Sequence, residues 1–238
     1  MSGLLVEDLT YSYGPKTALK DVSFSVAAGR FCVLLGPNGA GKSTLFSLLT
    51  RLLVSSKGRI SIAGYDLQCQ PRAALARLGI VFQQTTLDLD LTVAQNLRYF
   101  AALHGLSGKD ARMRIDAALD QLSMRERDGE KTRSLNGGHR RRAELARALI
   151  HDPEVLLLDE PTVGLDAAAR RSITEYAHHL ADEGKTVLWA THLTDEVYDK
   201  DRLVILHQAQ VLADGFAAEI AGDMPLADRF LSLTGAEA

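Results

Sequence analysis

The sequence predicts an α/β fold built around a mainly parallel β-sheet that is covered on both faces. Three short, continuous apolar runs, at residues 31–35, 155–158 and 186–190, are typical of strands buried on both sides. Segments with helical spacing alternate with these runs, which favours a parallel sheet. The start of the chain differs, because two stretches there alternate apolar and polar residues and predict an N-terminal antiparallel β subdomain.

The two alternating stretches lie on either side of a turn. Leu4–Tyr13 predicts an edge strand, Gly14–Thr17 predicts the turn, and Ala18–Val26 predicts the antiparallel partner. The run Phe31–Leu35 leads into a glycine-rich loop, and Ser43–Leu53 then predicts a helix. Further strands are predicted at residues 59–62, 79–82, 202–206 and 210–213.

A mostly helical stretch separates two α/β portions of the chain. Thr92–Leu103 predicts an amphipathic helix with Thr92 as its N-cap, and Gly108–Leu122 predicts a second helix. We therefore expect one domain over residues 1–238, with a core at approximately 1–83 and 136–238 and an inserted helical lobe at approximately 84–135.

Composition excludes several classes of protein. The 238 residues are 46% hydrophobic and 24% charged, which is typical of an ordinary globular domain. A net charge of −3 shows no basic excess, so we expect no nucleic-acid partner. The first ten residues have no basic start and no long apolar stretch, so we expect no secretory signal. No apolar run approaches the roughly 18 residues that span a bilayer. We expect a soluble chain, whose membrane role would need a separate partner.

The cysteines indicate no metal site and no disulfide framework. Cys32 and Cys69 are far apart in the sequence, and Cys32 lies within an apolar run, where a small core residue is expected. This usage is typical of a reducing cytosol.

A phosphate-binding loop follows the first apolar run. Gly36–Ser43 reads GPNGAGKS and matches the pattern G-x-x-x-x-G-K-[ST]. The glycines let backbone N–H groups face a phosphate, and the following helix adds a partial positive charge. We expect Lys42 to reach the β- and γ-phosphates, Ser43 to ligate Mg²⁺ and Thr44 to contact the α-phosphate. The strand before the loop and the helix after it make the pattern a prediction of nucleotide binding.

Two carboxylates end the second apolar run. Val155–Glu160 reads VLLLDE, which places both acids at the carboxyl edge of the sheet, where ligands bind in such folds. We expect Asp159 to hold Mg²⁺ and Glu160 to act as the general base that polarises the attacking water. Without the phosphate loop, the pair would equally be two solvated acids at a strand end.

Several motifs in this order resemble the ATP-binding subunits of ABC transporters, over nearly the whole chain. GPNGAGKST resembles the Walker A motif of that family and LLLDEP its Walker B motif. The resemblance implies a P-loop NTPase core, with ATP and Mg²⁺ as the bound nucleotide and metal, and ATP hydrolysis as the reaction.

Four shorter motifs support the same resemblance. VFQQ is similar to the Q-loop, with Gln83 contacting Mg²⁺ and sensing a transmembrane partner, and GLD, ending in Asp166, is similar to the D-loop. WATH ends in His192, which matches the switch histidine at the γ-phosphate, and Tyr13 matches the aromatic residue that stacks on adenine. Taken singly, these residues have structural alternatives: a polar residue after a strand, a helix cap, a surface histidine and a packing tyrosine. Their order and spacing favour the functional interpretation.

The resemblance implies a complete set of site residues. The implied catalytic residues are Lys42, Glu160 and His192. The implied metal ligands are Ser43, Gln83 and Asp159. The implied nucleotide contacts are Tyr13, Gly36, Pro37, Asn38, Gly39, Ala40, Gly41, Lys42, Ser43, Thr44, Gln83, Asn136, Gly137, Gly138 and Asp166.

The signature motif departs from the family pattern. The family has LSGGQ where this chain has LNGGH, so Asn136 replaces serine and His139 replaces glutamine, while Gly137 and Gly138 are kept. In the family this loop binds the γ-phosphate held by the opposite subunit, since glycines allow close approach and the helix dipole favours an anion. The Asn136 amide can donate in place of the serine hydroxyl. We therefore expect ATP-driven dimer closure to survive, with its strength left open.

Three arginines, at residues 140–142, follow the signature directly. We expect a solvated helix face here, and steering of nucleotide or lipid headgroups is the alternative. Together with QQTTLDLDLT at residues 83–92, this run is most similar to exporter-type ATPases paired with a separate multispan permease. A weaker similarity is to subunits that accompany pyrroloquinoline-quinone (PQQ) alcohol oxidation systems in bacteria.

The resemblance implies partners and a location. Two copies, or this chain and a related ATPase subunit, would form a head-to-tail dimer with ATP sandwiched between them. A separate transmembrane permease would dock around Gln84–Leu103, although those apolar residues would also serve as lobe core. The subunit would then be cytoplasmic and peripheral on the inner face of the cell membrane, and export rests on the resemblance alone.

Other functional classes fit the sequence less well. ABC ATPases of translation carry two ATPase domains in one chain, whereas this sequence shows one. ABC ATPases of DNA repair carry long coiled coils, and this sequence has no sustained heptad pattern. A P-loop kinase or GTPase would not need Gln83, the Gly137–Gly138 pair and His192 together. A nucleotide-gated interaction module that does not hydrolyse ATP is suggested by Asn136 and His139 alone.

Overall fold

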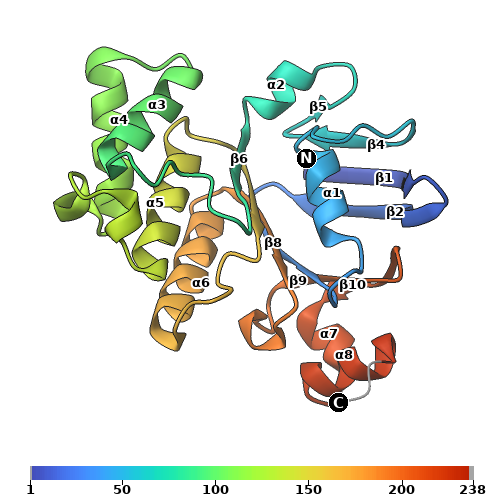
Figure 1. The fold of residues 1–238 in the computed structure, drawn as a ribbon. Coiled ribbons are helices and arrows are strands. Elements are labelled where there is room, and N and C mark those ends of the chain that lie inside the picture. Colours follow the sequence, from blue (N-terminus) through green and yellow to red (C-terminus); the bar gives the residue numbers. More distant parts are fainter. Residues whose placement is uncertain (1, 236–238) are drawn as a thin grey trace.

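Two β-sheets of different kinds organise the computed structural model, which describes residues 2–235 (Figure 1). Within these residues the first sheet has four antiparallel strands in the order β2-β1-β4-β5. Its strands are β1 (Ser2–Tyr13), β2 (Lys16–Ala27), β4 (Lys57–Ile62) and β5 (Tyr65–Asp66). The predicted N-terminal antiparallel subdomain is therefore confirmed.

The second sheet is mainly parallel, as predicted. In the described part of the chain it has six strands in the order β10-β9-β3-β8-β7-β6, and β10 alone runs antiparallel to its neighbour. Its strands are β3 (Phe31–Leu35), β6 (Leu78–Val81), β7 (Val155–Asp159), β8 (Thr186–Thr191), β9 (Arg202–His207) and β10 (Gln210–Phe216). β3 pairs with β8 on one side and β9 on the other, so it lies inside the sheet.

The prediction that Leu4–Tyr13 forms an edge strand was wrong. β1 pairs through Leu5 with Ser25 of β2 on one side and with Ser61 of β4 on the other. Side-chain alternation reports that one face of a strand is buried, but pairing at the two edges uses backbone groups that alternation does not report. An interior strand of a half-covered antiparallel sheet therefore has the same sequence pattern as an edge strand.

The described residues also form eight α-helices. They are α1 (Lys42–Leu49), α2 (Pro71–Leu75), α3 (Val93–Leu103), α4 (Gly108–Gln121), α5 (Gly137–Leu149), α6 (Ala167–Asp182), α7 (Ala217–Ala221) and α8 (Leu226–Thr234). Helix α1 ends at Leu49 rather than at the predicted Leu53, because Arg51 adopts a left-handed backbone with φ of 59°. Short α2, α7 and α8 were not predicted.

The predicted N-cap at Thr92 is confirmed with its full chemistry. Thr92 Oγ1 accepts from the Gln95 backbone N–H at 3.2 Å, and Gln95 Oε1 accepts from the Thr92 backbone N–H at 2.8 Å. This reciprocal pair is a capping box, which satisfies two N–H groups that the first turn of a helix leaves unpaired.

The buried strands send alternate side chains into two cores. From β3, Cys32 and Leu34 pack with α1 and the first sheet, whereas Phe31, Val33 and Leu35 pack with α3, α4, α5 and α6. All five side chains are buried, so the prediction of strands covered on both faces is confirmed. Cys32 is a core residue as expected, and it forms no disulfide with Cys69. Each fully buried leucine or valine contributes about 1.5–3 kcal/mol to folding.

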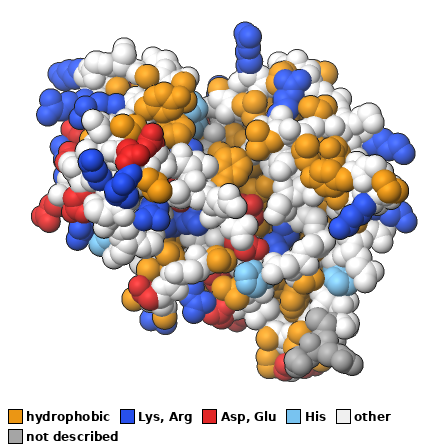
Figure 2. Space-filling model, viewed as in Figure 1, with side chains coloured by type: hydrophobic (Ala, Val, Ile, Leu, Met, Phe, Trp, Pro, Cys, Tyr) orange, Lys and Arg blue, Asp and Glu red, His pale blue; other side chains and the backbone are white. Residues whose placement is uncertain are grey.

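Helices α3 and α4 stand apart from the sheets and pack on α5, at the left of Figure 1. Side chains of both charges crowd this part of the surface in Figure 2. Arg125 and Asp116 form an ion pair of 2.6 Å in this part of the chain. Such exposed pairs add little stability, so α3 and α4 are held chiefly by their apolar contacts with α5. Among residues 2–235, no helix has both the length and the apolar character required to span a lipid bilayer.

Candidate functional site

The glycine-rich loop joins the end of β3 at Leu35 to the start of α1 at Lys42. A Cβ atom at Gly36 would lie 2.4 Å from the Leu206 carbonyl oxygen, and one at Gly41 would lie 2.6 Å from the Ala18 carbonyl oxygen. Gly41 also has a φ of 117°, a conformation that other residues rarely adopt. Glycine is therefore required at both ends of the loop, where it passes close to the backbones of β9 and β2.

Lys42 is the cation of this loop. Its Nζ donates to the Gly36 carbonyl at 2.6 Å and to the Pro37 carbonyl at 3.3 Å, and it lies 3.4 Å from Glu160 Oε1. Burial lowers the pKa of Lys42 below its usual range, while the Glu160 carboxylate opposes that shift. The side chain thus places a positive charge within the glycine-rich loop at the N-terminus of α1, an arrangement that favours a phosphate.

Three side chains converge on Glu160, whose own side chain is 8% exposed. Besides Lys42, Gln83 Nε2 donates to Glu160 Oε2 at 3.0 Å, and His192 Nδ1 lies 3.3 Å from Glu160 Oε1. The His192 contact lacks hydrogen-bond geometry, so this buried nitrogen has no hydrogen-bond partner among the described residues. Gln83, Lys42, Glu160 and His192 come from four separate segments, as the sequence predicts for one site.

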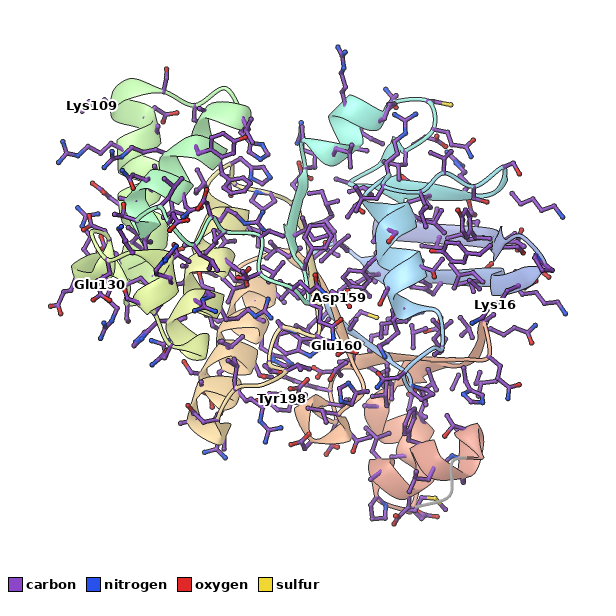
Figure 3. All side chains as sticks on the ribbon, in the orientation of Figure 1. Lys16, Lys109, Glu130, Asp159, Glu160 and Tyr198 are labelled. Atoms are coloured by element: carbon purple, nitrogen blue, oxygen red, sulfur yellow. The ribbon has the colours of Figure 1, made fainter. Side chains whose placement is uncertain are left out.

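The backbone of Glu160 is strained. Its φ is 45°, in the left-handed region, and its N–H donates to the Ala190 carbonyl at 2.9 Å. A non-glycine residue held in this region costs about 1–3 kcal/mol, and such residues cluster at functional sites. The carboxylate of Glu160 meets Lys42 of the phosphate loop, and Figure 3 labels Glu160 beside Asp159 in the middle of the molecule.

Asp159 lies beside Glu160 at the end of β7 and is 7% exposed. Burial and the neighbouring charge of Glu160 raise the pKa of Asp159 to about 6, against smaller opposing effects of Lys42 and Arg141. A bound cation would offset the free-energy cost of keeping the Asp159 carboxylate ionised. Among residues 2–235, no three acidic, histidine or cysteine side chains cluster as a metal site. Mg²⁺ usually takes only one or two carboxylates alongside substrate phosphates and water, so this donor set fits it.

A cavity of about 510 Å³ lies over the phosphate loop. This volume is within the range of small-molecule sites. Its lining includes the predicted residues Tyr13, Pro37, Asn38, Gly39, Gly41, Lys42, Ser43, Thr44, Gln83 and Glu160. Gly36 and Ala40 are predicted contacts that do not line it, because Gly36 packs against Leu206 and Ala40 is 3% exposed.

Tyr13 stands at the rim of this cavity and is 49% exposed. The edge of one ring meets the face of the other in its pair with Tyr11, with centroids 5.1 Å apart. A half-exposed ring at the mouth of a cavity can stack on a flat aromatic ligand.

Residues from two turns that line the same cavity were not predicted from the sequence. Lys16, Thr17 and Ala18 follow the β1–β2 turn, and Gln208 and Ala209 form the β9–β10 turn. Figure 3 shows Lys16 at the outer end of the first sheet. A lysine in a polar turn is a weak signal, and the β9–β10 turn carries no pattern that separates it from an ordinary hairpin.

Asn136 and Asp166 act as helix caps in this structure. Asn136 Oδ1 accepts from the His139 backbone N–H at 2.8 Å at the start of α5. Asp166 Oδ1 accepts from the Ala169 backbone N–H at 2.8 Å at the start of α6. Neither residue lines the cavity over the phosphate loop.

The glycines of the signature loop pack against the D-loop segment. A Cβ atom at Gly137 would lie 3.1 Å from Leu165 Cδ2, and one at Gly138 would lie 3.2 Å from Ala169 Cβ. The structure thus brings the predicted residues together in two groups. One surrounds the phosphate loop and Glu160, and the other is formed by residues 136–138 and the segment before α6.

Comparison with a protein-family model supplies the identity. Residues 19–163, more than half of the chain, match the model described as ABC transporter. The chain belongs to the ABC transporter family. It is an ATP-binding domain of the ABC ATPase type, and it is an enzyme that hydrolyses ATP.

Curated relatives of this ABC domain include proteins named for export and resistance. The linearmycin resistance ATP-binding protein LnrL of Bacillus subtilis is 35% identical over 97% of this chain and 74% of its own length. The Nod factor export ATP-binding protein I of Rhizobium johnstonii is 40% identical over 86% of this chain and 66% of its own, just under two thirds. The daunorubicin resistance ATP-binding protein DrrA3 of Streptomyces coeruleorubidus is 37% identical over 93% and 71%.

Solved structures of ABC ATPases share the fold. An ATP-binding subunit of an ABC transporter superposes with a TM-score of 0.85 at 28% identity, covering 97% of this chain and 98% of that one. CbiO1 of Clostridium perfringens, part of the ABC transporter complex cbiONQ, gives a TM-score of 0.85 at 30% identity, covering 98% and 95%. The predicted P-loop NTPase core with an antiparallel β subdomain is confirmed.

The ABC domain also holds a buried carboxylate, Glu196, that was not predicted from the sequence. Trp189 Nε1 donates to Glu196 Oε2 at 3.0 Å, and Thr162 Oγ1 donates to Glu196 Oε1. Glu196 is 4% exposed and joins the segment after β7 to β8. Nothing in the local sequence distinguishes this glutamate from a solvated one.

Proposed function

We propose that this ABC domain powers a transporter by closing around ATP as a dimer and driving a separate transmembrane permease, in the direction of export. The observation that carries the proposal is the convergence of Lys42, Gln83 and His192 on Glu160 beside the phosphate loop. A buried carboxylate held among a cation, an amide and an imidazole, at the edge of a cavity, is suited to accept a proton from water.

Each residue of the group has a step in the proposed reaction. The phosphate loop and Lys42 bind the β- and γ-phosphates, and the Glu160 carboxylate takes the proton of the water that attacks the γ-phosphate. His192 Nδ1, buried without a hydrogen-bond partner in the described residues, would turn to the γ-phosphate. Mg²⁺, held by Ser43, Gln83 and Asp159, would supply charge neutralisation for the phosphates.

The nucleotide contacts are divided between two copies in this proposal. Asn136, Gly137, Gly138 and Asp166 do not line the cavity of their own chain. They lie at capped helix N-termini, which favour an anion. In a head-to-tail dimer they would meet the γ-phosphate held by the opposite phosphate loop, so ATP would bridge the subunits. The second copy is the same chain or a related ATPase subunit.

The helical lobe is the proposed docking site of the permease. We assign it to residues 84–135, inserted between core segments 1–83 and 136–238. A permease on a separate chain would place the subunit on the cytoplasmic, inner face of the membrane. The relatives named for Nod factor export and drug resistance support the export direction. An association with PQQ-dependent alcohol oxidation systems stays a prediction.

Light scattering during size-exclusion chromatography of the Glu160→Gln variant tests the proposal. We expect a monomer without nucleotide and a dimer with Mg-ATP, because the variant binds ATP but cannot cleave the bridge. The wild type with Mg-ADP is the control and should stay monomeric. A Glu160→Gln protein that stays monomeric at saturating Mg-ATP, both alone and with Asn136→Ser added, would contradict the sandwich in the isolated domain.

A further inference from the structure

The three arginines after the signature have three different environments. Arg140 Nη2 donates to the Leu135 carbonyl at 3.1 Å, and Arg142 Nη2 donates to Ser172 Oγ at 3.2 Å. Both are partly exposed, whereas Arg141 is 8% exposed. The expected solvated helix face is therefore wrong for Arg141, which points from α5 into the protein.

Arg141 binds the backbone of the Q-loop. Its Nη1 donates to the Phe82 carbonyl at 2.6 Å, and its Nη2 donates to the Gln83 carbonyl at 3.0 Å. Nη1 also donates to Glu144 Oε2 at 2.8 Å, one helical turn further along α5. The planar guanidinium can serve three acceptors at fixed angles, which a lysine ammonium cannot reproduce.

Glu144 binds the two residues that directly follow the Q-loop. It is 2% exposed, and its Oε1 accepts from Thr85 Oγ1 at 2.7 Å and from the Thr86 backbone N–H at 3.0 Å. Arg141 thus holds the carbonyls of residues 82 and 83, and Glu144 holds donors of residues 85 and 86. Acceptors of the Q-loop and donors of the two residues after it are both engaged from a single helix.

Burial of this pair has a cost that indicates a role beyond stability. Burial lowers the pKa of Arg141, and Glu144 and Asp159 oppose that shift. A buried ion pair is rarely more stabilising than apolar packing, but its hydrogen bonds fix one geometry. The geometry fixed here continues to the catalytic carboxylate, because Gln83, held by Arg141, donates to Glu160 Oε2 at 3.0 Å.

We propose that Arg141 is a positioning residue for ATP hydrolysis. It sets the Gln83 backbone so that the Gln83 amide meets Glu160, and it joins this contact to α5, whose N-terminus carries the signature loop. The inference rests on the proposed role of Glu160 as the base. Since α5 also packs against β6, the strand that leads into the Q-loop, a shift of the signature end of α5 would move Gln83 relative to Glu160 (Figure 1).

Steady-state hydrolysis of Mg-ATP by Arg141→Lys tests the proposal, with Arg142→Lys as the matched control. The lysine keeps the positive charge but lacks the planar guanidinium that binds the two carbonyls and Glu144 at once. We expect kcat to fall on the order of tenfold, since small misplacements of a catalytic group have effects of this size. KM for Mg-ATP should stay within about twofold, because the phosphate loop is untouched. Arg142→Lys should leave both constants unchanged.

A double-mutant cycle separates positioning from a general weakening of the fold. If Arg141 acts through the Gln83 amide, Arg141→Lys should cause no further loss of kcat in a Gln83→Ala background. Wild-type kcat in Arg141→Lys would overturn the proposal, and so would an equal loss in both backgrounds. Should Arg141→Lys fail to fold, Glu144→Gln takes its place with the same expectations.

The proposed function fails separately. A Glu160→Gln protein that hydrolyses ATP at the wild-type rate would remove Glu160 as the base. Loss of turnover in Glu160→Gln, with wild-type kcat in Arg141→Lys, would overturn the positioning role alone.

Discussion

Lys42 Nζ lies 3.4 Å from Glu160 Oε1, and the two side chains are 5% and 8% exposed. A lysine and a glutamate buried this deeply are stable only as partners, because either charge alone would lose its hydration without compensation. The same lysine donates to carbonyls of the phosphate loop. The proposed base and the phosphate-binding cation are therefore held in one electrostatic unit.

We expect Glu160→Gln to reduce ATP turnover by about 10²–10⁴, the usual contribution of a positioned general base. ATP affinity should change by less than about threefold, because glutamine keeps the size of the side chain and Lys42 remains in place. Phosphate release and a fluorescent ATP analogue measure the two quantities. Glu126→Gln, at an exposed lobe position, is the control and should match the wild type.

Asp159→Asn should stabilise the nucleotide-free protein above about pH 6. The pKa of Asp159 rises from 3.8 to about 6 on folding, so its protonated form favours the folded state. That contribution is fully present below about pH 4 and is lost as pH rises through about 6. Asparagine removes the buried charge and should raise the free energy of unfolding by about 1–3 kcal/mol at neutral pH. Mg-dependent turnover should fall in the same variant.

The comparison is made by urea unfolding of Asp159→Asn and wild type between about pH 4 and pH 7.5. The advantage of the variant should be near zero at the acid end and grow as pH rises. A difference that stays constant over this range would show that Asp159 has the same pKa in the folded and the unfolded protein.

Asn136→Ser should leave the stability of the domain nearly unchanged, and Asn136→Ala should lower it by about 1 kcal/mol. Asn136 Oδ1 caps α5 through the His139 N–H, and serine is a comparable N-cap whereas alanine has no acceptor. Thermal unfolding monitors both variants, with Ser134→Ala, at an exposed neighbouring position, as the control. Equal stability of Asn136→Ala and wild type would show that the cap contributes nothing.

Acidification should weaken the contact between α3 and the segment after α5. His104 and His151 stack there with ring centroids 3.8 Å apart, and His151 Nε2 lies 3.1 Å from the Leu78 carbonyl. Burial, with a smaller effect of His104, lowers the pKa of His151 to about 4. A lowered histidine pKa contributes stability that is present above about pH 6.5 and lost as pH falls through about 4. We expect a loss of about 1–2 kcal/mol from this residue.

His151→Gln should remove that part of the acid sensitivity, since the glutamine amide can still donate to Leu78 but does not titrate. Unfolding free energies at about pH 4.5 and pH 7 measure it for the variant and the wild type. His179→Gln, whose histidine is exposed on α6, serves as the matched control. An identical loss on acidification in all three proteins would contradict the assignment.

Much of the site was predictable because its residues belong to short motifs whose members are close together in the sequence. The phosphate loop needs glycines at fixed spacing, and the structure shows why, since Gly36 and Gly41 approach the backbones of β9 and β2. The pair at Asp159 and Glu160 follows a buried strand for an equally local reason. These signals depend on neighbours in the sequence.

Contacts between distant segments were not predictable in the same way. Arg141 lies in a run of three identical residues, between Arg140 and Arg142, and only the packing of α5 against the Q-loop separates a buried arginine from two partly exposed ones. Glu196 is likewise buried because Trp189 and Thr162 meet it. The position of β1 inside its sheet also depends on β4, whose pairing leaves no trace in the alternation of β1.

The place of β3 in its sheet has a consequence for biosynthesis. This strand, which leads into the phosphate loop, pairs with β8 and β9 and with no other strand in the described residues. As the ribosome makes the chain from its N-terminus, residues 31–35 emerge about 150 residues before either partner, an arrangement of high contact order. The apolar run must remain unpaired throughout that interval, where such segments are prone to aggregate. Nascent chains that stop before Thr186 should therefore depend on chaperones and bind no ATP.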